Sequence, residues 1–144
     1  MDNQGSIPKF NRPGVSDKFL HDHGIRNVGK EDARGLCSTV DPGVWIPYKD
    51  YEGIDVEDGD LPFGRLRRSE PGEKPRYHQK GKTGVHAYFP KPTIELESSD
   101  TMILIEGEFK ALCLAEHGFP VIGLPGIGDT VAKTLRVSSS WTQG

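Results

Sequence analysis

The apolar residues of this chain fall into short runs that glycine, proline and charged residues separate. The clearest run, Thr101–Ile105, is continuous and typical of a strand covered on both faces by helices. Glu108–His117 then carries strong helix formers with an apolar stripe, Gly118 ends that helix, and Pro120–Leu124 predicts a second short strand. Together they predict a βαβ unit, whose right-handed crossover places the loops after both strands at one edge of a parallel sheet.

The first third of the chain predicts two short helices. Ser16 or Asp17 is placed to cap a helix that carries Phe19 and Leu20 and ends near Gly24. A second helix is expected from about Lys30 to Leu36. Residues 1–15 contain Pro and Gly with few apolar anchors, so we expect a flexible or loosely docked leader with little chemistry.

Three further runs predict strands. Val44–Tyr48 is apolar and interrupted by Pro47, which favours a strand at or near a sheet edge. Residues 50–53 predict a turn, and Val85–Phe89 predicts another strand. In Phe63–Arg68 the alternation places Phe63, Arg65 and Arg67 on one face and Gly64, Leu66 and Arg68 on the other.

These elements predict an α/β chain, α+β overall, in which a small mixed-sheet segment precedes the βαβ unit. The expected boundaries are a flexible leader at 1–15, a segment with basic strands at 16–98, the βαβ unit at 99–137 and a disordered tail at 138–144. At 144 residues the chain has room for one compact domain, or for one domain with a small appended piece.

Charge is distributed unevenly along the chain. The net charge is −3, yet residues 64–91 hold eight Lys and Arg against two Glu, a local charge of +6 that leaves −9 for the rest. Such a separation is typical of polyanion binding, although a solvated face is the alternative. The acids between Asp50 and Asp60 predict a solvated loop, with a cation site as the alternative, and their spacing does not match a calcium loop.

Several classes of site are not supported by the sequence. The longest strongly apolar stretch is too short to cross a bilayer and the N-terminus lacks the features of a signal peptide, so we expect a cytoplasmic protein without a membrane partner. Cys37 and Cys113 belong to no paired motif, which argues against a disulfide framework or zinc site; we expect Cys113 in the core. We also expect no haem or flavin, and the five histidines have no metal-ligand spacing.

One set of residues carries a resemblance to a known family. Ile103–Leu112, followed by Ala115–Gly126, resembles the start of the TOPRIM domain of primases and topoisomerases, above all the toprim-like domains of phage and plasmid replication proteins. Upstream segments, in order, resemble the part that precedes TOPRIM in bacterial-type primases: Ile46–Tyr48, Gly64-Arg65, Lys74–Tyr77 and Gly84–Phe89. The order and rough spacing agree from about residue 19 to residue 128.

The resemblance implies a catalytic role for Glu106, as general acid or base or as a tentative Mg²⁺ ligand. Gly107, Gly126 and Gly128 would leave room for a phosphate at the same edge of the sheet. In the family an Asp-x-Asp pair completes the metal site, and none follows Glu106 here. We therefore expect this chain to be catalytically incomplete, since two-metal chemistry needs several carboxylates. The alternative is that Glu106 merely caps the following helix.

The basic segment fits the family's use of its upstream region to hold nucleic acid. Tyr77, Tyr88 and Phe89 would offer stacking surfaces to bases, with the core as the alternative for the last two. The residues expected to contact DNA or RNA, most of them able to neutralise phosphates, are Arg65, Arg67, Arg68, Lys74, Arg76, Tyr77, Lys80 and Lys82.

The sequence thus predicts a nucleic-acid-binding, primase-type TOPRIM-like module of a phage or mobile-element DNA-replication protein. Its expected partners are a replicative helicase or the remainder of a primase, and any activity would be primase-type nucleotidyl transfer with the metal site completed elsewhere. One alternative is a free-standing, non-enzymatic interaction or inhibitor protein that acts on a nucleic-acid machine. A weaker alternative is a TOPRIM-type metal-dependent nuclease.

Overall fold

The computed structural model describes residues 6–37, 39, 41–69, 77–79, 86–90 and 102–124. The chain divides into two compact units: unit 1 comprises residues 1–48 and 55–83, and unit 2 comprises residues 49–54 and 84–144. Both helices and strands are present, which confirms the predicted α+β class. Unit 2 includes residues 49–54 and 84–98, which the sequence analysis assigned to the preceding segment.

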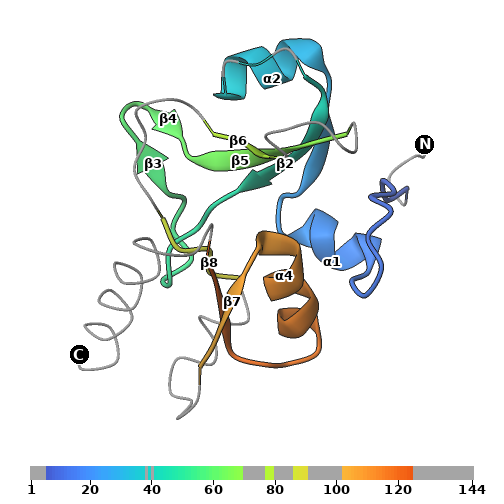
Figure 1. Ribbon diagram of the computed structural model, residues 1–144, viewed down its shortest axis with the longest axis vertical. Coiled ribbons are helices and arrows are strands. Elements are labelled where there is room, and N and C mark those ends of the chain that lie inside the picture. Colours follow the sequence, from blue (N-terminus) through green and yellow to red (C-terminus); the bar gives the residue numbers. More distant parts are fainter. Residues whose placement is uncertain are drawn as a thin grey trace. The chain divides into compact units, whose positions relative to one another are not determined.

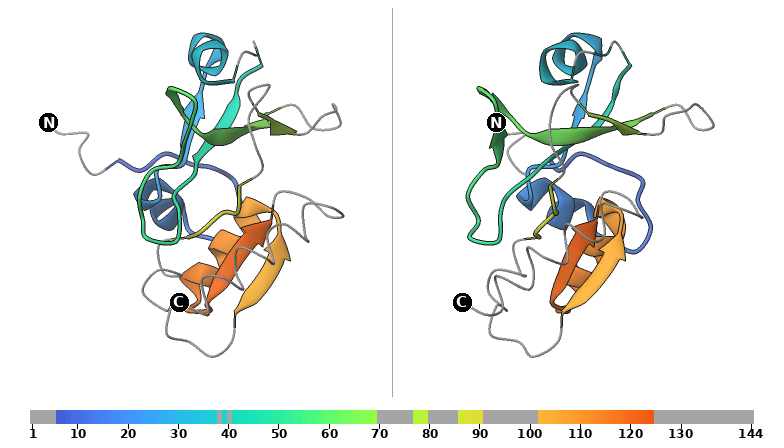
Figure 2. Two further views of the ribbon diagram at one scale, coloured as in Figure 1. Left: turned by 90° about the vertical axis from the view of Figure 1, so that its left-hand side faces the viewer. Right: turned by 60° about the vertical axis from the view of Figure 1, so that its left-hand side comes forward.

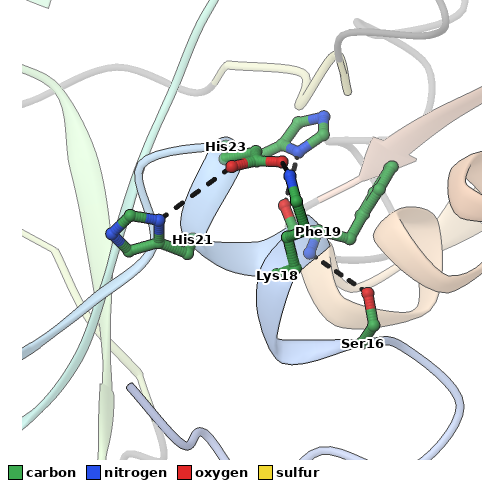
Figure 3. Close-up of polar contacts among 6 residues, drawn as sticks. Ser16, Lys18, Phe19, His21 and His23 are labelled. Carbon is green, nitrogen blue, oxygen red and sulfur yellow. Dashed lines mark hydrogen bonds and ion pairs between the residues drawn. The ribbon is translucent and has the colours of Figure 1, made fainter. Parts of the chain in front are cut away.

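Helix α1 (Asp17–Asp22) begins at the residue that the sequence predicts. Ser16 has extended backbone angles, and its hydroxyl oxygen accepts a hydrogen bond of 3.1 Å from the Phe19 amide (Figure 3). Gly24 follows the helix with φ +80°, a conformation that glycine adopts without strain. The next residue, Ile25, is buried.

The segment before α1 is anchored to unit 1. Phe10 and Val15 are both buried, and the Phe10 amide donates a 3.1 Å hydrogen bond to the Asp17 carboxylate. The Asn27 side-chain amide donates to the Lys9 carbonyl oxygen at 3.4 Å. Of the two expectations for this segment, a flexible or a loosely docked leader, the described residues 6–15 agree with a docked one. Burial of the two apolar side chains stabilises the docking, because it removes apolar surface from water.

Unit 1 contains a four-stranded sheet in the order β1-β2-β5-β6, visible in Figure 1. Its strands, all antiparallel to their neighbours, are β1 (Arg26–Val28), β2 (Gly43–Pro47), β5 (Gly64–Arg68) and β6 (Tyr77–His78). β2 lies one strand in from the edge strand β1, which agrees with the prediction that it lies at or near an edge. Pro47 is tolerated because it is the last residue of the strand, opposite Gly64.

Helix α2 (Lys30–Cys37) packs against one face of this sheet (Figure 1). The contact is a cluster of buried apolar side chains: Val28, Ala33, Cys37, Trp45 and Leu66. Burial raises the pKa of the Cys37 thiol, so this cysteine is a core residue rather than a reactive thiolate. The predicted helix is confirmed, one residue longer than expected.

The acidic segment after β2 forms ordered turns. Gly53 donates to the Asp50 carbonyl oxygen at 3.0 Å, which confirms the predicted turn. Farther along, β3 (Glu57–Asp58) and β4 (Leu61–Pro62) pair as a short antiparallel hairpin in unit 1. The acids predicted in a solvated loop are therefore partly in a hairpin, whose β4 residues are exposed.

Unit 2 contains the predicted βαβ unit: β7 (Ile103–Glu106), α4 (Glu108–Glu116) and β8 (Val121–Leu124). The two strands are parallel, with Glu106 opposite Leu124, and Figure 2 shows them side by side with α4 against one face. The strand–helix–strand prediction is confirmed. No helix among the described residues is long and apolar enough to cross a membrane.

Burial within unit 2 differs from the expectation. All four residues of β8 are buried, whereas β7 is only partly buried and its last residue is exposed. The reason is that β8 has a second neighbour, Tyr88, which bridges to Gly123 through two hydrogen bonds of 2.8 Å. Residues 86, 87 and 89 beside this bridge are not in a strand, so the strand predicted there is limited to one residue among those described.

The buried face of α4 is narrower than the apolar stripe of its sequence. Ala111, Leu112 and Ala115 are buried, whereas Phe109 and Cys113 are half-exposed. The expectation that Cys113 belongs to the core is therefore wrong, because the helix faces β7 and β8 with the neighbouring stripe.

Candidate nucleic-acid interface

Two faces of the unit 1 sheet differ in chemistry. Strand alternation places Leu66 toward α2, and Arg65 and Arg67 toward the opposite face. Tyr77 of β6 pairs with Arg67, so its ring is on that opposite face too. We call Arg65, Arg67 and Tyr77 the arginine face. The sequence predicted this alternation, and the structure confirms it.

The three side chains of the arginine face are in contact. The Arg65 guanidinium carbon lies 4.4 Å from the centre of the Tyr77 ring, and that of Arg67 lies 5.6 Å from it. Arg67 also donates a hydrogen bond of 3.4 Å to the Tyr77 hydroxyl. Cation–π contacts of this kind contribute about 0.5–2 kcal/mol and hold the planar guanidinium groups in place. The ring therefore orders two positive charges beside each other.

A third arginine joins this group from the N-terminal segment. Burial lowers the pKa of Arg12, and the nearby positive charge of Arg67 lowers it further, while Tyr77 acts in the opposite direction. Arg12 is thus close enough to both side chains to interact electrostatically. It remains positively charged at neutral pH, because the ordinary pKa of a guanidinium lies far above neutrality.

Arg68 lies on the α2 side of the sheet. Its guanidinium is 3.4 Å from a carboxylate oxygen of Asp41, which also lies 3.2 Å from the His78 ring. Thr39 donates to the same oxygen at 3.3 Å. The structure therefore does not bring Arg68 together with Arg65 and Arg67, and Asp41 offsets its charge.

Four of the predicted contact residues lie outside the described part of the chain: Lys74, Arg76, Lys80 and Lys82. Tyr88 and Phe89, whose alternative roles were stacking and core, are both buried in unit 2, at 3% and 8% exposure. Neither ring offers an open face, so the core alternative holds for both.

In unit 2 the predicted catalytic residue stands at the carboxyl end of β7. Glu106 is exposed, and the described residues show no hydrogen bond or ion pair to its carboxylate. Gly107 follows with φ 102° and donates a 2.9 Å hydrogen bond to the Leu124 carbonyl oxygen. This backbone bond joins the ends of β7 and β8, as expected of a parallel pair. The Glu106 side chain itself is exposed to solvent.

Glu106 does not occupy the N-cap position of helix α4. The N-cap of the helix is Gly107, which makes no side-chain cap bond. The alternative role of Glu106 as a helix cap is therefore not what the structure shows.

A second carboxylate near this edge is buried. Glu108, in the first turn of α4, is 1% exposed. Burial raises the pKa of the Tyr88 phenol well above its ordinary value, and the negative charge of Glu108 raises it further. Tyr88 therefore stays protonated in the folded chain at any physiological pH.

The described residues contain no group of three or more His, Cys, Asp or Glu side chains arranged to hold a metal ion. Glu106 alone does not make a Mg²⁺ site, which takes several oxygen ligands, so no catalytic step follows from it here. Gly126 and Gly128, the other predicted phosphate-loop residues, lie outside the described part of the chain.

The sequence analysis missed Arg12, Asp41 and Glu108. Arg12 stands between Asn11 and Pro13 in a segment without hydrophobic periodicity, so nothing in the sequence indicated its position. Glu108 was visible only as a helix former that follows Gly107.

The chain matches no protein-family model and no curated protein.

Proposed function

We propose that this chain is a nucleic-acid-binding module of the primase-type, TOPRIM-like kind, from a phage or mobile-element replication protein. The observation that carries the binding part is the convergence of Arg65 and Arg67 on Tyr77. Paired guanidinium groups, held by an aromatic ring, match the charge and geometry of phosphate oxygens.

The TOPRIM-like part is supported by the βαβ unit of residues 103–124. A glutamate at the exposed end of its first parallel strand, followed directly by a glycine, is the arrangement that the resemblance implies. Glu106 would supply one carboxylate to a Mg²⁺ site whose other ligands come from elsewhere. The partner classes proposed on the same resemblance are a replicative helicase and the remainder of a primase.

Binding is tested with a fluorescent single-stranded oligonucleotide whose anisotropy is followed over a range of salt concentrations. We expect the double variant Arg65→Gln, Arg67→Gln to bind more weakly and with a salt slope smaller by about 1.4, at about 0.7 for each lost phosphate contact. The matched control is Lys30→Gln, Arg34→Gln, which removes the same charge from exposed positions of α2. Equal losses in both double variants would show that only net charge matters and would refute the interface.

The role of Glu106 is tested separately, by Mg²⁺ titration in primer-synthesis and nuclease assays. Any activity of the wild type should be lost in Glu106→Gln and kept in Glu52→Gln, which removes an exposed carboxylate from the same unit. Activity retained in Glu106→Gln would remove this residue from the chemistry. Salt-sensitive binding without activity in any variant would favour the non-enzymatic interaction protein.

A further inference from the structure

One outer strand of the described sheet, β6, is held from both faces. It pairs with β5 at two positions, Tyr77 opposite Arg67 and His78 opposite Leu66. Because successive side chains of a strand point to opposite faces, Tyr77 lies on the arginine face and His78 on the α2 side. A contact that holds His78 therefore also fixes the position of the Tyr77 ring.

On the α2 side, the Asp41 carboxylate holds His78. Its Oδ2 atom lies 3.2 Å from the His78 Nε2 atom. An ionised carboxylate only accepts hydrogen bonds, so the hydrogen of this bond is on Nε2. The His78 side chain is 21% exposed and that of Asp41 is 35% exposed, so water competes with the bond less than at an open surface.

Asp41 is itself fixed in place. The same Oδ2 atom accepts a hydrogen bond of 3.3 Å from the Thr39 hydroxyl and lies 3.4 Å from a guanidinium nitrogen of Arg68 in β5. Directly after β5, the Ser69 amide donates a hydrogen bond of 3.2 Å to the Pro42 carbonyl oxygen. The carboxylate therefore joins the segment before β2 to both β5 and β6.

This attachment matters because the backbone pairing of β6 is short. Two residue pairs supply few hydrogen bonds, and each contributes little net free energy in water. On the arginine face, the centre of the Tyr77 ring lies 4.4 Å from the guanidinium carbon of Arg65 and 5.6 Å from that of Arg67. The contact of His78 with Asp41 is therefore a substantial part of what keeps the ring beside both arginines.

We propose that Asp41 and His78 are positioning residues of the arginine face: their contact holds β6, and with it the Tyr77 ring that orders the two arginines. Neither residue contacts the phosphate, because their contact is on the opposite side of the sheet. This inference rests on the proposed function and deepens it, since it assigns the geometry of the phosphate site to a pair that no basic residue of that site includes.

The test compares two amides at one position. The amide nitrogen of Gln lies about as far along its side chain as Nε2, so His78→Gln keeps a donor within reach of Asp41. That of Asn lies only about as far as Nδ1, so His78→Asn does not. The control is His21→Asn, the same change at an exposed histidine of unit 1. All variants are made in the full chain, and the amide resonances of β2 show whether the sheet remains folded.

The first readout needs no ligand. The ring current of Tyr77 displaces the side-chain Nε–H resonance of Arg65, and Tyr77→Leu gives the position of that resonance without the ring. We expect His78→Gln and His21→Asn to keep the displacement and His78→Asn to lose most of it. Equal displacement in the two His78 variants would overturn the inference, because the ring would then not depend on the Asp41 contact.

The second readout is the anisotropy of a labelled single-stranded oligonucleotide. We expect His78→Asn to bind about three- to ten-fold more weakly than the wild type, and His78→Gln and His21→Asn within about two-fold of it. Apparent affinity falls with the fraction of molecules in which a site is assembled, and one hydrogen bond shifts that fraction by at most about ten-fold.

The outcomes separate the inference from the proposed function. If the wild type binds the strand and the two His78 variants bind it equally well, the inference fails and the proposed function stands. A resonance displacement that is lost in His78→Asn without weaker binding has the same meaning. A wild type that binds no strand removes the proposed function, and the inference with it.

Discussion

At the scale of single residues, the structure separates basic side chains that are close in sequence. Arg67 and Arg68 are neighbours, yet one contacts Tyr77 while the other is paired with Asp41 on the opposite face of the sheet. Charge counted along the sequence therefore overstates the number of residues available to one phosphate backbone. Conversely it omits Arg12, which lies two residues after the buried Phe10 and whose pKa is lowered by burial and by the charge of Arg67.

Tyr88 gives a prediction about alkaline pH. Its pKa is raised in the folded state by burial and by Glu108, whereas in the unfolded chain it is near 10. The raised pKa of Tyr88 therefore contributes its full share to the free energy of unfolding below about pH 10. This contribution is lost as the pH rises further, by about 1.4 kcal/mol per pH unit. Urea unfolding, followed by circular dichroism at pH 9 and pH 11, should show a smaller alkaline loss for Tyr88→Phe than for the wild type. Identical losses would mean that this phenol is not the group responsible.

At the scale of elements, the contact between β2 and β5 depends on a glycine. A Cβ atom added at Gly64 would overlap the Trp45 ring and lie 2.6 Å from the Ile46 carbonyl oxygen. The atoms that the added Cβ would meet belong to the backbone and to a buried ring, so they have little room to move away.

We expect Gly64→Ala to lower the free energy of unfolding by about 1–3 kcal/mol. The comparison is Gly35→Ala in α2, where no atom lies within 4 Å of the added Cβ and a gain of about 0.5–1 kcal/mol is expected. The measurement is urea unfolding followed by Trp45 fluorescence, in a Trp141→Phe background. Two variants of equal stability would contradict the packing described for β2 and β5.

The start of α1 gives a second prediction at this scale. Ser16→Ala removes the acceptor of the Phe19 amide and should cost about 1 kcal/mol, whereas Ser16→Asp keeps an acceptor and should cost less. The same fluorescence-detected unfolding measures both. An Asp variant as unstable as the Ala variant would show that the cap bond contributes nothing.

The sequence predicted the elements whose patterns are local. The cap at Ser16, helix α2 and the β7–α4–β8 unit each follow from residues within a few positions of one another. The failures depend on partners far along the chain. Pro47 correctly favoured a place at or near an edge, but it did not indicate the neighbours of β2, since β1 and β5 come from separate segments. Cys113 was expected in the core because apolar character alone does not decide which stripe of a short helix faces the strands.

For the candidate sites, too, local patterns were predicted and contacts between distant segments were not. Alternation along β5 predicted the shared face of Arg65 and Arg67, and the βαβ pattern predicted Glu106 at the end of β7. The contact of both arginines with Tyr77 requires the pairing of β5 with β6, which no local pattern specifies. Arg12 and Asp41 required the complete fold of unit 1.

At the scale of the whole molecule, the two proposed activities belong to different units. The arginine face is in unit 1, and Glu106 is in unit 2. We therefore expect Glu106→Gln to leave the oligonucleotide affinity and its salt slope within about two-fold of the wild type, since exposed substitutions seldom alter stability by more than about 0.5 kcal/mol. The anisotropy titration that tests Arg65 and Arg67 also tests this expectation, and a large change in affinity would place Glu106 in the binding surface.

The central claim is that nucleic acid binds at the arginine face. Its most direct test is an NMR titration of the isotope-labelled chain with a short single-stranded oligonucleotide, following the side-chain Nε–H resonances of arginine and the backbone amides. The account predicts the largest shifts at Arg65, Arg67 and Tyr77, and small ones at Arg34 of α2. Shifts concentrated on α2, or the absence of any shift at the arginine face when the strand is bound, would contradict it.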